Sequence, residues 1–118
     1  MRNPLGDKQR LLHIRDAIEN IFAFTKGMDE RAYISNVMVQ SAVERQMEII
    51  GEAVNSVSDE LKEKHTDIEW YKIKAFRNVI AHEYFGISNK QVWNVVANEL
   101  PHLKTSIEKI LLSFDIQK

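Results

Sequence analysis

The amino-acid sequence predicts an all-α protein, an up-and-down bundle of four main helices with short helical segments between them. Apolar residues recur at spacings of three and four along most of the chain, which is the pattern of one buried helix face. Glycine and proline are scarce, with four and two copies, and no stretch shows the sustained alternation of a strand. A length of 118 residues fits one domain. We therefore predict a single helical domain over residues 1–118, with its core at about residues 8–114.

The pattern in the first half of the chain predicts two long helices, a short helix between them and a further turn or two after the second. Helical spacing of apolar residues places the first helix over residues 8–26. Gly27 is its expected stop, because glycine readily takes the left-handed conformation that ends helices. A short helix is expected over residues 29–34 and a longer one over residues 35–57. Residues 58–64 then add one or two turns before a polar loop.

The second half contains two capping-box signatures, of which the first lies at Thr66 and Glu69. In such a box a threonine caps the helix and a glutamate three residues later bonds back to it. A helix is therefore expected to start there and to run through Trp70 into residues 77–84.

The second capping box predicts the start of the final helix. Ser88 and Gln91 have the required spacing, while Ile87 and Val92 are placed to close a hydrophobic staple. Pro101 interrupts the apolar pattern that follows, either as a kink or as the first residue of a new segment.

The composition is that of a soluble cytoplasmic domain. Hydrophobic residues make up 44% and charged residues 28% of the chain. The formal net charge of −1 excludes a basic coat, so contact with nucleic acid has to come from a local patch. The absence of cysteine excludes a disulfide framework and a thiolate zinc site. No signal-peptide pattern is present, and no apolar run reaches the roughly 20 residues of a membrane span. We expect no contact with membranes.

Residues 77–84 form the stretch whose side chains favour chemistry over packing. Arg77 is permanently charged, His82 titrates near neutral pH and Tyr84 carries a phenol, all within about two helical turns. These groups suit a metal-free site for a phosphodiester, because arginine binds phosphate through two donors and histidine transfers protons. A purely structural origin is the alternative, since salt-bridged arginines and interface histidines also occur on amphipathic helices.

Helical geometry separates the arginine from the histidine. Arg77 and His82 are five residues apart, which places them about 140° from each other around a regular helix. Either the helix ends near His82 and the chain turns at Gly86, or a second copy of the helix supplies the missing group. A two-fold pairing would bring two arginines and two histidines into one cleft, so a homodimer is expected.

Arg77, Asn78, His82 and Tyr84 form an Arg-Asn-x3-His-x-Tyr pattern that resembles the HEPN superfamily, and more closely the HepT-like toxins. These toxins are paired with a minimal nucleotidyltransferase as antitoxin. Ser88 stands where the family more often has Asp, and both residues cap helices well. The resemblance extends over most of the chain through these further residues: Glu44-Arg45, Gly51-Glu52-Ala53, Trp70, Tyr84-Phe85-Gly86-Ile87 and Val92-Trp93.

The resemblance implies a HEPN-like fold and a metal-independent endoribonuclease site, without a cofactor, shared across a homodimer. His82 would be the general base or acid toward a ribose 2′-hydroxyl. Arg77 would hold the phosphate, and Asn78 would orient His82 or bond to a phosphate oxygen. In this toxin family the motif tyrosine, here Tyr84, accepts AMP from the nucleotidyltransferase. The added charge and bulk would exclude RNA.

Lys72 and Lys74 precede the motif and are candidate RNA contacts, although solvated helix residues give the same pattern. No metal site is expected, because Glu48 and Glu52 are not accompanied by a His or Asp cluster at ligand spacing.

Two readings without nuclease activity stay open beside the toxin. In the first, the chain is a helical binding module that docks a nucleotidyltransferase or presents Tyr84 to it. Alternatively, it is a structural helical dimer in which Arg77 contributes only to stability.

Overall fold

Helices account for all the regular secondary structure of the described residues. The structure is a computed structural model that describes the backbone of residues 4–81 and 88–116 and the side chains of residues 6–75 and 88–114. Within these ranges there is no strand, so the predicted all-α class is confirmed. The helices are α1 (Pro4–Phe24), α2 (Glu30–Ile34), α3 (Val37–Ser56), α4 (Asp59–Lys64), α5 (Trp70–Ala81), α6 (Asn89–Asn94), the π-helical turn η2 (Val95–Glu99) and α7 (Leu100–Ile116).

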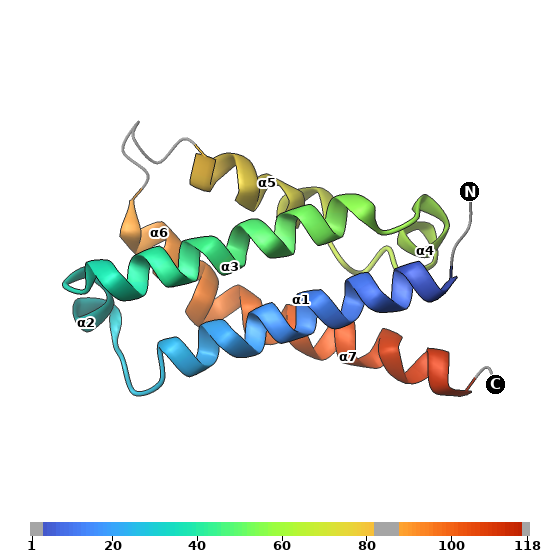
Figure 1. The fold of residues 1–118 in the computed structure, drawn as a ribbon, viewed down its shortest axis with the longest axis horizontal. Coiled ribbons are helices and arrows are strands. Elements are labelled where there is room, and N and C mark those ends of the chain that lie inside the picture. Colours follow the sequence, from blue (N-terminus) through green and yellow to red (C-terminus); the bar gives the residue numbers. More distant parts are fainter. Residues whose placement is uncertain (1–3, 82–87, 117–118) are drawn as a thin grey trace.

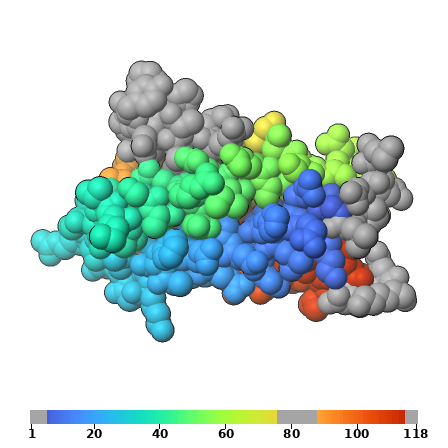
Figure 2. Space-filling model, in the orientation of Figure 1, coloured from blue at the N-terminus to red at the C-terminus, as the bar shows by residue number. Residues whose placement is uncertain are grey.

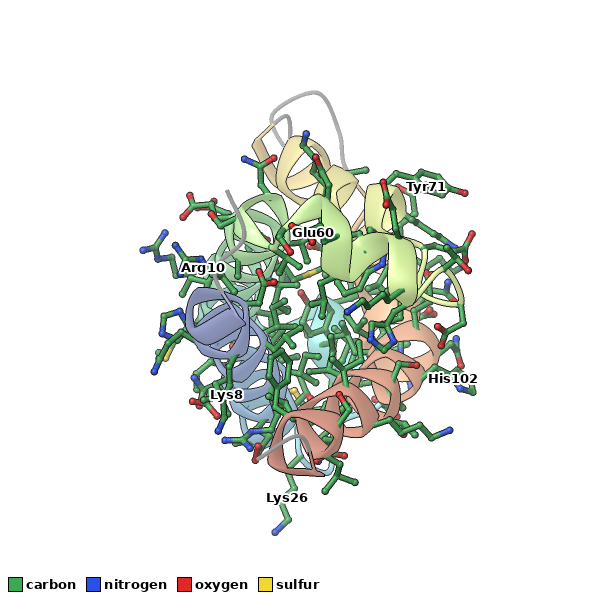
Figure 3. The ribbon with its side chains drawn as sticks, turned by 90° about the vertical axis from the view of Figure 1, so that its right-hand side faces the viewer. Lys8, Arg10, Lys26, Glu60, Tyr71 and His102 are labelled. Carbon is green, nitrogen blue, oxygen red and sulfur yellow. The ribbon has the colours of Figure 1, made fainter. Side chains whose placement is uncertain are left out.

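The four longer helices form the bundle. α3 packs against both α1 and α5, and α1 packs against α7, in the order that Figure 1 shows from α5 at the top to α7 at the bottom. α1 and α3 make the face of the molecule seen in Figure 2. Along the bundle, side chains fill the space between the helices (Figure 3). The fully buried side chains come mainly from α1, α3 and α7, and they include Leu11, Ile14, Ile18, Ile21, Val43, Ile50, Leu100 and Ile107.

The first helix starts earlier than the sequence predicted, at residue 4 instead of residue 8. Asp7 explains the extra turn. Its buried carboxylate accepts hydrogen bonds from the backbone N–H and the hydroxyl of Ser58, at 2.9 and 2.6 Å. The start of α1 is thereby fixed to the start of α4. At the other end of α1, Gly27 has a φ of 77°, which confirms the predicted stop.

The second long helix, α3, in contrast begins later than predicted. Residue 35, the expected first residue, instead ends α2, and Asn36 caps α3. The Asn36 side chain accepts a hydrogen bond from the backbone N–H of Val39 at 3.0 Å. Asp29 caps α2 in the same way, with 2.8 Å to the N–H of Ala32.

The capping box predicted at Thr66 and Glu69 is wrong, because α5 begins only at Trp70. The intervening residues form a turn in which the backbone N–H of Ile68 donates to the carbonyl of His65 at 3.2 Å. The indole N–H of Trp70 donates to the same carbonyl at 3.0 Å. Ile68 and Trp70 are both buried, so core packing overrides the local capping preference.

The final helical stretch begins at the predicted cap and accommodates Pro101. Ser88 accepts from the backbone N–H of Lys90 at 3.1 Å, whereas Ile87 of the expected staple lies outside the described residues. Pro101 lies in the first turn of α7, directly after η2. The N–H of Leu100 bonds five residues back, to Val95. A widened turn relieves the clash that proline makes with the carbonyl four residues earlier. No helix of the described ranges has the length and apolar content that a membrane span requires.

Candidate functional site

α5 carries the first part of the predicted site. Arg77 and Asn78 lie on its helical backbone, but their side chains belong to the part of the chain that is not described. His82, Tyr84 and the expected turn at Gly86 lie outside the described residues. Their predicted roles therefore stay predictions, and the described surroundings of α5 define the site.

The helical register aligns the position of Arg77 with buried residues of α5. Arg77 stands four residues after Ile73 and seven after Trp70, which are 6% and 8% exposed. Residues at these spacings share one face of a helix, and α5 packs against α3. Asn78 instead stands four residues after Lys74 and seven after Tyr71, both exposed. The arginine position thus shares a stripe of α5 with buried residues, and the asparagine position shares one with exposed residues.

The opposing part of α3 has an acidic side chain close to a buried phenol. In Figure 1 the end of α5 lies over the N-terminal half of α3. Glu44 lies in that half, and its charge acts on Tyr33 of α2. Burial in the first place, and the Glu44 charge in the second, raise the pKa of Tyr33 well above its usual value.

Tyr33 anchors the corner between α2 and α3. Its side chain is fully buried, and its ring lies 5.4 Å from the ring of Trp93 on α6. The amide of buried Gln40 donates to the carbonyls of both Tyr33 and Ile34, at 2.9 Å each. Within the described structure the Tyr33 hydroxyl has no hydrogen-bond partner. This corner is held by packing and by Gln40, not by the phenol.

Tyr33→Phe should therefore raise the free energy of unfolding by up to about 1 kcal/mol, because it removes a buried hydroxyl without a partner. The raised pKa of Tyr33 means that the parent loses stability relative to the variant as the pH rises above 10.0, where tyrosine in the unfolded chain ionises. Urea unfolding of both proteins at neutral pH and above pH 10.0 measures the two effects. A clear loss of stability at neutral pH would show that the hydroxyl has a partner.

A groove runs along one side of α5. Lys72 and Ala75 form one wall, α6 and η2 form the other, and Met47 of α3 contributes to the lining. The Lys72 ammonium is 2.8 Å from the Glu99 carboxylate on η2. The pKa of Lys72 is raised, mainly by this hydrogen bond and next by the negative charge of Glu99. The positive charge of Lys72 is largely balanced at this site.

Lys74 lies on the other side of α5. It lines a second hollow together with Lys62 of α4 and the neighbouring Tyr71. The structure therefore does not bring Lys72 and Lys74 together into one basic patch. It instead places Lys74 on the same hollow as Lys62 and Tyr71, a grouping that sequence reasoning missed. The spacing of three residues between Tyr71 and Lys74 was the available signal.

No group of three or more His, Asp or Glu side chains is placed to hold a metal ion in the described ranges. The metal-independent chemistry implied by the motif stays a prediction.

The fold and the motif together define a class of protein. An all-α bundle with Arg-x4-His starting near the end of α5 is a HEPN-like domain. A model of the HepT-like ribonucleases matches residues 14–110, so the chain belongs to the HepT-like ribonuclease family. The predicted family and the predicted class of enzyme, a ribonuclease, are confirmed.

Similar proteins of archaea and bacteria carry ribonuclease names. The "Probable ribonuclease HepT" of Thermococcus cleftensis is 34% identical over 103 residues, which are 87% of this chain and 94% of the relative. Two proteins are each named a "putative RNase". The one from Methanocaldococcus jannaschii is 34% identical over 101 residues, 86% of this chain and 93% of the relative. The one from Caldanaerobacter subterraneus is 33% identical over 101 residues, which are 86% of this chain and 90% of the relative. No solved structure gives a significant match.

Proposed function

We propose that the chain is the toxin of a toxin–antitoxin pair, a metal-independent endoribonuclease in which Arg77 and His82 act together at the interface of a homodimer. The family match over residues 14–110 carries the proposal, because it includes the whole motif at residues 77–84. The substrate is RNA. The partner is a minimal nucleotidyltransferase that adds AMP to Tyr84, and the protein works in the cytoplasm.

The reaction proposed for this site is a transesterification. The ribose 2′-oxygen attacks the adjacent phosphorus, and the bond from phosphorus to the 5′-oxygen of the next nucleotide breaks. His82 takes the proton of the 2′-hydroxyl, and a proton from the second histidine of the dimer or from water goes to the leaving oxygen. Arg77 binds the phosphate oxygens as negative charge builds up on them, and Asn78 supports His82 or the phosphate. The products are a cyclic phosphate and a free 5′-hydroxyl.

The register of α5 supports a shared site. The position of Arg77 shares a helical stripe with buried Trp70 and Ile73, and a residue five positions later on a regular helix stands about 140° away. A second chain related by a two-fold axis supplies the missing group from its own copy of the motif.

The surface offers a contact region for a second copy. Ile34, Val37 and Met38 are 44%, 73% and 81% exposed at the corner between α2 and α3. This corner and the end of α5 lie in the same half of the molecule (Figure 1). Exposed apolar side chains gathered at one place indicate an interaction surface.

Modification of Tyr84 would silence the site electrostatically and sterically. Each AMP adds about one negative charge and the volume of a nucleoside. Tyr84 follows His82 by two residues, so this charge arises close to the groups that bind the RNA phosphate.

The purified chain should cleave single-stranded RNA equally well with and without EDTA and should leave cyclic phosphate ends. Co-production with the nucleotidyltransferase should abolish cleavage and increase the intact mass by AMP, which peptide mapping should place on Tyr84. A chain that accepts AMP but never cleaves RNA would instead be a binding module for the nucleotidyltransferase. Cleavage that stops in EDTA would exclude the metal-independent mechanism.

A further inference from the structure

A hollow of about 460 Å³ lies between α4 and the first turns of α5, on the side of α5 away from Lys72. Its floor is apolar, formed by Val54, Ile68 and Trp70. Its polar rim comes from two helices, with Lys62 on α4 and Tyr71 and Lys74 on α5. The volume is within the range of small-ligand sites.

Tyr71 presents its ring to solvent at the rim of this hollow. The residue is 74% exposed, and Figure 3 shows its side chain pointing away from the bundle. Its hydroxyl donates to the Glu69 carboxylate at 3.2 Å, which restrains the ring. An exposed aromatic ring held in place is suited to stacking with a nucleobase of any identity.

The positively charged side chains near Tyr71 favour binding of a polyanion beside the ring. Lys62 and Lys74 flank the hollow, and both are free of the ion pairs found among the described residues. Glu69 is the carboxylate on the rim, and it faces the Tyr71 hydroxyl. Two lysines beside an aromatic ring are the elements of a single-strand binding site, in which cations track the backbone and rings carry bases.

The register of α5 connects this rim to the catalytic motif. Tyr71, Lys74 and Asn78 are spaced by three and four residues, so their positions form one stripe along the helix. Tyr71 and Asn78 are seven residues apart, or about 10 Å along the axis. A nucleic-acid strand rises about 3.4 Å per stacked nucleotide, so this distance corresponds to at most about three nucleotides. A strand held at Tyr71 therefore reaches the motif without a large detour.

We propose that the hollow between α4 and α5 is a subsite for single-stranded RNA, in which a base stacks on Tyr71 and the backbone phosphates contact Lys62 and Lys74. The inference rests on the proposed ribonuclease function, since it places part of the same substrate. It assigns binding, not catalysis, to these three residues. It also explains how a chain with a net charge of −1 binds RNA, because the positive charge is local.

The test is RNA binding by chains that cannot cleave. In a His82→Ala background, Tyr71→Ala should weaken the binding of a short, fluorescently labelled single-stranded RNA about tenfold, as expected for the loss of one stacked base. Tyr71→Phe should keep most of the affinity, because the stacking ring stays and only the hydrogen bond that restrains it is lost. Lys62→Ala and Lys74→Ala should each lower the slope of log affinity against log salt by about 0.7.

Matched controls come from the opposite side of the molecule. Lys26→Ala removes a lysine that projects away from the side of Tyr71 in Figure 3, and Phe24→Ala removes a ring that is 39% exposed. Neither should change the affinity for RNA or its salt dependence. Thermal melting of every variant controls for folding.

The results separate this inference from the proposed function. If the parent cleaves RNA but Tyr71→Ala binds it as tightly as the background, the subsite is wrong and the ribonuclease stands. If the parent never cleaves but binds RNA through Tyr71, the subsite stands and the ribonuclease is wrong. If Tyr71→Ala weakens only the binding of the nucleotidyltransferase, the hollow is a protein-docking surface and the subsite is overturned.

Discussion

Co-production of an Arg77→Ala chain with a His82→Ala chain should restore RNA cleavage that neither variant shows alone. Each single variant should cleave at least about 100-fold more slowly than the parent, because one loses phosphate binding and the other loses proton transfer. In a mixed dimer the shared cleft keeps one arginine and one histidine. Cleavage by purified mixed dimers, separated through two different tags, should recover to as much as about half of the parent rate.

The control for this experiment is a mixed dimer of Arg77→Ala with the doubly substituted chain. It contains no Arg77 and should stay inactive. Absence of recovery in the mixed dimer of single variants would place Arg77 and His82 of one chain in one site. It would thereby contradict the proposed sharing across the dimer.

Trp70→Ala should be the substitution with the largest effect on stability among those at the start of α5. Trp70 is 8% exposed, and its indole N–H donates to the His65 carbonyl at 3.0 Å. Loss of a buried tryptophan costs about 3–5 kcal/mol in unfolding free energy. The effect should reach the site, because the position of Arg77 is on the same face of the same helix.

Urea unfolding of Trp70→Ala, Trp70→Phe and Tyr71→Ala measures this effect. Phenylalanine keeps most of the apolar packing but loses the indole N–H, so its cost should be intermediate. The neighbouring Tyr71 is 74% exposed, and its replacement should change stability by no more than about 0.5 kcal/mol. Equal effects of the substitutions at residues 70 and 71 would show that the indole does not hold α5.

Sequence reasoning located helices where local signals agree with packing. Gly27 ends a helix and Ser88 caps one at the predicted places, while Asp29, expected as the first residue of the short helix, is its cap. Sequence reasoning failed where contacts between distant residues determine the start of a helix. Thr66 has the spacing of a cap, yet the burial of Trp70 and its bond to His65 delay the helix. The early start of α1 depends on Asp7 and Ser58, which are 51 residues apart.

For the site, the motif and its family were recognisable from the sequence, because its residues are contiguous. Its surroundings were not. The pair of Lys72 with Glu99 joins two helices that are distant in sequence, and no local pattern indicates it. Lys62 and Lys74 likewise line one hollow only because of how the chain between α4 and α5 folds. Tyr33 gave no signal at all, because its role follows from burial at a corner between helices.

The corner held by Gln40 has a consequence for the chemical ageing of the protein. The amide of Gln40 donates to two carbonyl oxygens at once, and its side chain is among the few buried polar groups of the described structure. Spontaneous hydrolysis of that amide would leave a carboxylate facing two carbonyls, with repulsion in place of two hydrogen bonds. A single deamidation, which leaves the backbone intact, would loosen α2 from α3 and disturb the packing of Tyr33 on Trp93.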